Sequence, residues 1–255
     1  MSDVLFAFLL TLFAGLSTSI GGAIGVLAKR SNLKFLALCL SFSAGVMLFI
    51  SFVEIFDKAK ESLSDAYGYD RGFLFTIIAF FAGVLLLVLI DRFIPHHEDR
   101  TDKGDTSDLK RTGVTAALAV AIHNFPEGLV TFMAAMYDPA LGVAIALAIA
   151  MHNIPEGIAV SAPIYYATGS KKKALLFSAA SGLTEPLGAL AGYVLLSQIF
   201  GERFFGFTFA AVGGMMVFVA LHQLLPAANK YGDHHLIIKG CLSGMVVIAL
   251  TLLVL

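Results

Sequence analysis

Two copies of a short polar motif stand inside apolar stretches of this chain. Residues 123–128 read HNFPEG and residues 152–157 read HNIPEG, each after a run of Leu, Ala, Val and Ile. In a helix, residues four apart lie one turn apart on the same face, so each His would share a face with the Glu of its own motif. The candidate ligands are His123, Asn124, Glu127, His152, Asn153 and Glu156.

These residue types favour the binding of a divalent transition metal. A carboxylate at the centre of a bilayer costs about 2.5–3.5 kcal/mol on insertion scales, and a divalent cation would offset that cost. Imidazole, carboxylate and amide oxygen together suit Zn²⁺, Fe²⁺, Mn²⁺ or Co²⁺ better than Cu⁺, which prefers sulfur, or Mg²⁺, which prefers oxygen alone. The two glutamates are also able to bridge a pair of ions.

A third acidic residue, Glu185, stands within the uncharged stretch SGLTEPLGAL at residues 181–190. We expect it to be a further ligand, and the alternative is a lone glutamate that is hydrogen-bonded between helices.

The prolines and glycines of the two motifs also bear on the site. Pro126 and Pro155 have no N–H, so we expect the helices to kink and to free main-chain carbonyls there. Gly128 and Gly157 carry no side chain beside the glutamates, which lets neighbouring helices approach.

The composition predicts the elements that position these residues. The chain is 58% hydrophobic and 14% charged, whereas soluble domains carry about 25% charged residues. Because a helix needs about 20 apolar residues to span a bilayer, the sequence predicts an all-α, polytopic membrane protein with one transmembrane domain over residues 1–255. The eight predicted spans are 4–28, 35–56, 72–94, 112–136, 140–166, 174–199, 204–226 and 236–255.

The distribution of charge predicts the orientation of the spans. Most of the 17 Lys and Arg residues follow the first, third, fifth and seventh spans, so the positive-inside rule puts those loops in the cytoplasm and both termini outside. At 1.5 Å rise per residue, His123 and His152 lie about 17 Å into two consecutive, antiparallel spans. Both motifs would therefore meet near the middle of the bilayer.

Between the third and fourth spans, residues 95–111 are polar, mixed in charge and predicted to be flexible. His96 and His97 in this loop either collect metal or form a solvated pair.

The second and seventh spans resemble one another. GVMLFISFVEIFDKA (45–59) aligns with GMMVFVALHQLLPAA (214–228), and an odd offset of five spans makes the two copies antiparallel. This predicts an inverted repeat, as in many secondary transporters, with a three, two, three plan (3+2+3) and the paired motif in the middle. Glu54, His222 and Gln223 occupy matching positions, where they either line an ion path or mark helix ends.

The chain resembles the ZIP (Zrt-, Irt-like protein) family of divalent-metal transporters, most closely its bacterial zinc transporters. The resemblance is carried by HNFPEG, HNIPEG and SGLTEP on the fourth, fifth and sixth of eight spans. The resemblance implies a binuclear metal site at mid-membrane. One half would use His123, Glu127, His152 and Glu156; the other would use Asn124, Glu127, Asn153, Glu156 and Glu185. One departure concerns the seventh span, where many relatives carry an acidic residue and this chain has His222 and Gln223.

The resemblance implies import of zinc, and also iron, manganese, cobalt or cadmium, into the cytoplasm by alternating access. The expected protein is a multi-pass protein of the cell (inner) membrane whose partners are divalent metal ions and the lipid bilayer. No nucleic acid and no cofactor beyond the transported metal are expected, and a homodimer is left open.

Two alternatives remain at this point. A metal-selective channel would use the same residues. An intramembrane metalloenzyme would need a motif such as HExxH or Glu-x-x-His, and neither is present in the paired motifs, so we predict that the chain is not an enzyme. Cys39 and Cys241 both fall in apolar runs and are interpreted as packing residues.

Overall fold

The computed structural model describes residues 3–27, 33–92, 106–196 and 202–254, and all regular structure within them is helical. The first half comprises α1 (Asp3–Leu27), α2 (Leu33–Ile50), a π-helical turn η1 (Ser51–Ile55), α3 (Phe56–Tyr67), α4 (Tyr69–Asp91) and α5 (Thr106–Tyr137). The second half comprises α6 (Pro139–Thr168), α7 (Lys171–Gly182), α8 (Thr184–Leu196), α9 (Glu202–Val219), a π-helical turn η2 (Ala220–Leu224), α10 (Leu225–Tyr231) and α11 (His234–Val254).

Eight helical stretches among the described residues are long and apolar enough to cross a membrane. Their large outward-facing side chains are apolar, as on α11, where Leu242 and Leu250 are more than half exposed. An apolar surface of this kind is stable against lipid and unfavourable in water. The structure therefore confirms an all-α protein with eight membrane-spanning helices.

Two spans run further than predicted. The second span includes η1 and continues beyond residue 56 as α3, ending at Tyr67. The seventh continues beyond residue 226 and ends at Tyr231. Although α3 is polar along much of its length, it buries Ala59 and Leu63 and packs on α4 and α9. The packing face explains why the helix persists where the apolar run ends.

The π-helical turns η1 and η2 lie at matching positions of the sequence repeat. Ser51 and Ala220, their first residues, are separated by the same offset as Gly45 and Gly214, which begin the aligned segments. In both turns the main-chain N–H of the following residue bonds five residues back, from Phe56 to Ser51 and from Leu225 to Ala220. The two copies thus share a backbone irregularity as well as sequence.

The predicted flexible loop at residues 95–111 is only partly described. Residues 93–105, with His96 and His97, lie outside the described residues, and α5 already begins at Thr106. The fourth span therefore starts earlier as a helix than its apolar run suggests.

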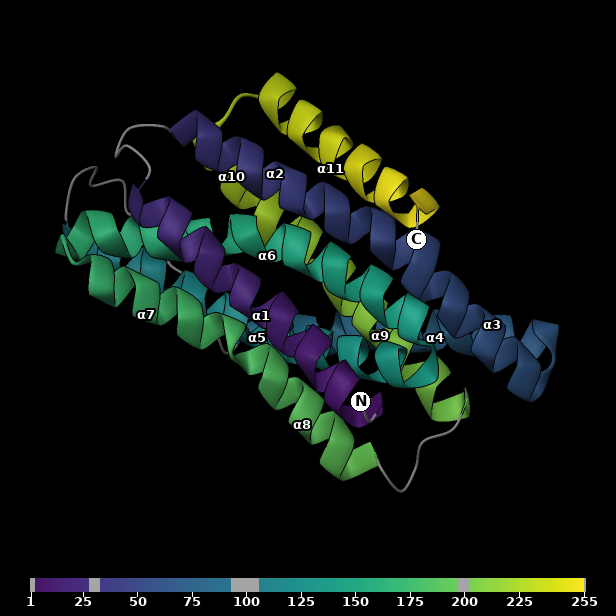
Figure 1. Ribbon diagram of the computed structural model, residues 1–255. Coiled ribbons are helices and arrows are strands. Elements are labelled where there is room, and N and C mark those ends of the chain that lie inside the picture. The colour runs from purple at the N-terminus through teal and green to yellow at the C-terminus, as the bar shows by residue number, and fades with distance from the viewer. Residues whose placement is uncertain (1–2, 28–32, 93–105, 197–201, 255) are drawn as a thin grey trace.

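The helices pack in two groups (Figure 1). We call α1, α5, α6, α7 and α8 the site group, because they carry both motifs and Glu185. We call α2, α3, α4, α9, α10 and α11, with η1 and η2, the flanking group. Figure 1 shows α11 lying along α2, and α7 and α8 following α1 on the opposite side of the molecule.

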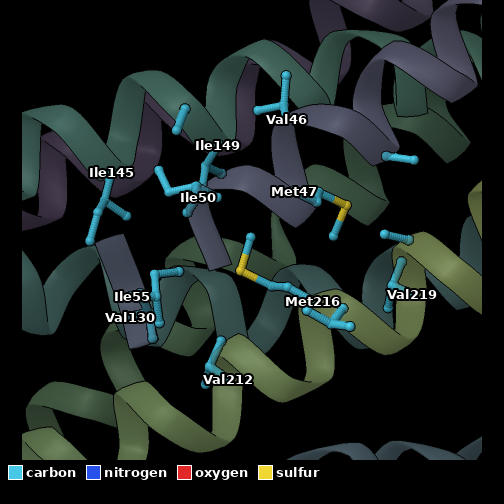
Figure 2. Packing of buried hydrophobic residues seen from close by; sticks show 14 of the residues in the cluster. Val46, Met47, Ile50, Ile55, Val130, Ile145, Ile149, Val212, Met216 and Val219 are labelled. Atoms are coloured by element: carbon cyan, nitrogen blue, oxygen red, sulfur yellow. The ribbon is translucent and has the colours of Figure 1, made fainter. Parts of the chain in front are cut away.

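An apolar layer fills the boundary between the groups, where α2 packs on α6 and α9 packs on α5. Figure 2 shows Ile50 of α2 beside Ile149 of α6, with Met47 of α2 and Met216 of α9 in the same apolar layer. All of these side chains are buried. The flanking group therefore holds the site group mainly through non-directional apolar contacts.

A tight connection sets the register of α5 and α6. Asp138 caps α6 by accepting a hydrogen bond from the N–H of Ala140 at 2.8 Å, and Pro139 occupies the first turn. Asp or Asn at the cap followed by Pro is a favoured helix start. Because the connection is so short, the two motifs, at similar distances from it, arrive at the same level.

Candidate metal centre

The two motifs face one another and are paired crosswise. The Nε2–H of His123 donates to Glu156 Oε2 at 3.0 Å, and the Nε2–H of His152 donates to Glu127 Oε2 at 3.2 Å. Each His therefore bonds the Glu of the other helix rather than the Glu one turn away in its own motif. The antiparallel packing of α5 on α6 puts residues 123 and 156 at one level and residues 127 and 152 at the next.

Both motif asparagines use their amide nitrogens to hold neighbouring helices. Asn153 Nδ2 donates to the carbonyl of Ala14 on α1 at 3.0 Å and to Glu185 Oε1 on α8. Asn124 Nδ2 donates to the carbonyl of Ser181 on α7 at 3.4 Å. Since the amide nitrogen is occupied in each case, the amide oxygen is left as the free ligand atom.

All seven predicted ligands lie in the interior of the protein. His123 is 3% exposed, Glu127 is 1% exposed, and the other five are fully buried. The structure thus brings together every residue that the sequence analysis named for the site.

Each of the seven also has a buried oxygen or nitrogen without a hydrogen-bond partner. These atoms are His123 Nδ1, Asn124 Oδ1, Glu127 Oε1, His152 Nδ1, Asn153 Oδ1, Glu156 Oε1 and Glu185 Oε2. Leaving a buried polar atom unsatisfied costs about 1–3 kcal/mol. Seven such atoms within one cluster indicate a site built to hold something polar or charged.

In this conformation the imidazoles and carboxylates bond one another in pairs. Across the described residues, no three His, Cys, Asp or Glu side chains are arranged around a common point as a metal site would need. Metal binding at this cluster therefore requires side chains to exchange their present hydrogen bonds for bonds to the ion.

The motif glycines bring helix backbones into direct contact, as predicted. A Cβ added at Gly128 would overlap the main-chain carbonyl of Glu185, and one added at Gly157 would overlap that of Thr18. Both α5 and α6 continue past their motif prolines as helices. These contacts pack α8 against α5 and α1 against α6 directly beside the motif glutamates.

Glu185 lies just after an interruption of the sixth span. Helix α7 ends at Gly182, Leu183 forms a turn, and α8 begins at Thr184. Pro186 has no N–H for the carbonyl of Gly182, four residues earlier, which favours a break at this point. The sequence analysis predicted one unbroken span over residues 174–199. Gly182 and Pro186 were the signals in the sequence that could have indicated the interruption.

The remaining polar candidates lie away from the cluster. Glu54 is half-buried on η1. His222 Nδ1 lies 3.6 Å from Asp91 Oδ2, and Gln223 Nε2 donates to Asp91 Oδ1 at 3.4 Å. Sequence reasoning missed Asp91, whose only signal was an acidic residue at the end of an apolar run. Cys39 and Cys241 are free and partly buried.

The fold and this cluster define a multi-pass membrane protein with ligand-type side chains sealed between its helices. A family model described as ZIP zinc transporter matches residues 91–252. The chain is 54% identical to the zinc transporter ZupT of Chlorobaculum parvum, over 99% of each chain. It is also 54% identical to the zinc transporter ZupT of Nitratidesulfovibrio vulgaris, over 98% of this chain and 97% of the relative. A protein of the same name from Clostridium perfringens is 50% identical over 99% of this chain and 97% of its own length.

The chain therefore belongs to the ZIP zinc transporter family. The resemblance found in the motifs is confirmed, and so is the prediction of a multi-pass protein of the inner membrane. The chain is a divalent-metal transporter and not an enzyme, because the family and these relatives are transporters.

Proposed function

We propose that the chain imports zinc through a binuclear site formed by the seven clustered residues. One ion would be bound by His123, Glu127, His152 and Glu156; the other would be bound by Asn124, Glu127, Asn153, Glu156 and Glu185. Glu127 and Glu156 would be shared by both ions. Iron, manganese, cobalt and cadmium are proposed as further substrates, because the mixture of imidazole, amide and carboxylate suits such metals.

The observation that carries this proposal is the set of seven buried atoms without hydrogen bonds, one on each proposed ligand. Glu127 and Glu156 each have one oxygen bonded to an imidazole and one oxygen free. A carboxylate with a free oxygen beside a second ligand is able to bridge two ions. The amide oxygens of Asn124 and Asn153 are oriented by the hydrogen bonds of their amide nitrogens, as outer-sphere partners orient metal ligands.

Alternating access is favoured over a channel by the burial of the site. With all seven residues at 3% exposure or less, an ion cannot reach them from either side without movement of the helices. The division into a site group and a flanking group with an apolar boundary offers such a movement, because apolar contacts have no fixed partners to break. We propose that the site group moves relative to the flanking group during transport.

The proposed topology follows the distribution of Lys and Arg and the internal repeat. An even number of spans puts both termini on one side, and the positive-inside rule makes that side the exterior. The matching positions of η1 and η2 support a 3+2+3 inverted repeat with α5 and α6 at its centre. A homodimer is compatible with this plan but is not required by it.

The binuclear site makes a prediction about zinc stoichiometry. The purified wild-type protein is expected to bind two zinc ions per chain, and Glu185→Gln is expected to bind one, because Glu185 belongs to only one of the two proposed ion positions. Equilibrium dialysis followed by metal analysis measures both values.

The matched control for this measurement is Glu61→Gln. Glu61 lies on the surface of α3, in an exposed ion pair with Lys58, and its replacement should leave two ions bound. A wild-type protein that binds only one ion, or a Glu185→Gln protein that still binds two, would contradict the assignment.

A further inference from the structure

Among the described residues, a hydrogen bond crosses the boundary between the flanking group and the site group beside the proposed metal ligands. Ser43 lies on α2, in the flanking group, and its hydroxyl donates to the main-chain carbonyl of His152 on α6 at 3.3 Å. Both residues are fully buried. The bond therefore links α2 directly to a residue of the proposed metal site.

Most buried hydroxyls in these helices choose a different partner; Ser178 also bonds a neighbouring helix, but within the site group. Buried Ser and Thr side chains in helices commonly bond the carbonyl three or four residues earlier on their own helix. Ser41, two residues away, does so with Ala37 at 2.8 Å, and Thr131 does so with Glu127 at 2.9 Å. Ser43 instead bonds to the other helix group.

The surroundings of Ser43 give this bond particular weight. The same face of the boundary is formed by apolar side chains, including Met47 and Ile50 of α2 and Ile149 of α6 (Figure 2). Such contacts resist separation of the groups but define no register between them. A directional hydrogen bond within that layer does define a register.

The bond also occurs in only one copy of the internal repeat. In the alignment that matches Gly45 with Gly214, the counterpart of Ser43 is Val212, a buried residue without a hydroxyl. The crossing bond is therefore not required by the packing that the two copies share.

We propose that Ser43 is a reversible latch that holds α6 in one register against α2. When the site group moves, the bond between the Ser43 hydroxyl and the carbonyl of His152 breaks. The latch therefore stabilises the conformation described here relative to the one that follows the movement. This inference rests on the proposed alternating-access function, since it assigns a role in the movement that such a function needs.

Removing the latch should change the balance between conformations and leave the ligands in place. A neutral hydrogen bond contributes about 0.5–1.5 kcal/mol net, which is about a 2- to 13-fold change in a population ratio. Ser43→Ala should therefore shift the population away from this conformation by that factor. Ser41→Ala is the matched control, because it removes one buried hydroxyl from the same helix without touching the crossing bond.

The test is a distance measurement between the two groups. Spin labels are attached at Leu176 on α7 and Leu85 on α4, both largely exposed, in full-length protein in which Cys39 and Cys241 are serine. Pulsed electron–electron double resonance in proteoliposomes then gives the relative population of each distance between the two labels. The latch predicts that Ser43→Ala changes these relative populations severalfold while Ser41→Ala reproduces the parent protein.

Two further readouts separate this inference from the proposed function. Zinc stoichiometry should be the same in both variants, and the rate of zinc uptake should change in Ser43→Ala only. Identical distance populations in Ser43→Ala and Ser41→Ala would overturn the latch even if zinc uptake is normal. Absence of uptake by the unmutated protein would count against the proposed function, whereas the distance populations would still decide on the latch.

Discussion

Glu156→Ala is expected to reduce zinc uptake to the level of vesicles without protein. The change removes a proposed ligand of both ions and takes the hydrogen-bond acceptor away from His123, whose Nε2 lies 3.0 Å from Glu156 Oε2. The unsatisfied imidazole costs about 1–3 kcal/mol, which the packing of α6 against α1, α2 and α5 should tolerate. Uptake of radioactive zinc into proteoliposomes measures the effect.

The control for this prediction is Glu61→Ala, which removes a carboxylate from the exposed ion pair of α3. Gel filtration and thermal melting should show both variants folded, with uptake lost only in Glu156→Ala. Wild-type uptake by a folded Glu156→Ala protein would defeat the bridging role of this glutamate.

Gly157→Ala is expected to cause a large loss of stability for a single added methyl group. The new Cβ would overlap the carbonyl of Thr18 and lie 2.8 Å from the main-chain nitrogen of Gly22, both on α1. Because backbone atoms cannot move aside as side chains do, α1 and α6 must separate. Overpacking costs about 1–3 kcal/mol or more, so the melting temperature in detergent should fall clearly.

Gly213→Ala provides the comparison for that variant. A Cβ at Gly213 would meet first the side-chain methyl Cγ2 of Ile55 at 3.1 Å, which can give way by a small rotation. We expect Gly213→Ala to melt close to the wild type. Equal melting temperatures for the two variants would show that the contact between α1 and α6 at Gly157 is looser than described.

Much of the site could be predicted from the sequence because it depends on the four-residue spacing of His and Glu and on the repetition of that spacing in the next span. The spacing of His123 and Glu127 fixed one helix face, and its repetition at His152 and Glu156 on the next, antiparallel span implied that the faces meet. The isolated charge of Glu185 in an apolar run predicted a third contributor. The structure brings all three elements together.

What the sequence did not predict depends on contacts between distant segments. The second span was ended at residue 56 because polar residues follow, yet the helix continues as α3, which packs on α4 and α9. The crosswise pairing of His123 with Glu156 depends on the register of α5 against α6. The bond from Ser43 to His152 has no local signal, because a serine in an apolar helix ordinarily bonds its own backbone.

The pairing of Asp91 with His222 and Gln223 was missed for the same reason. Three polar residues near the ends of two different spans become neighbours only when α4 packs on the helix that contains η2. Whether His222 and Gln223 line an ion path or mark a helix end stays a prediction.

The most direct test of the central claim compares wild type and Glu127→Gln in proteoliposomes, with radioactive Zn²⁺ and with Fe²⁺, Mn²⁺ and Mg²⁺ as competitors. Gln keeps the size of the side chain and removes the charge that the proposed site needs. We predict saturable uptake by the wild type, competed by Fe²⁺ and Mn²⁺ but not by Mg²⁺, and lost in Glu127→Gln. Undiminished uptake by Glu127→Gln would contradict a transport site at the paired motifs.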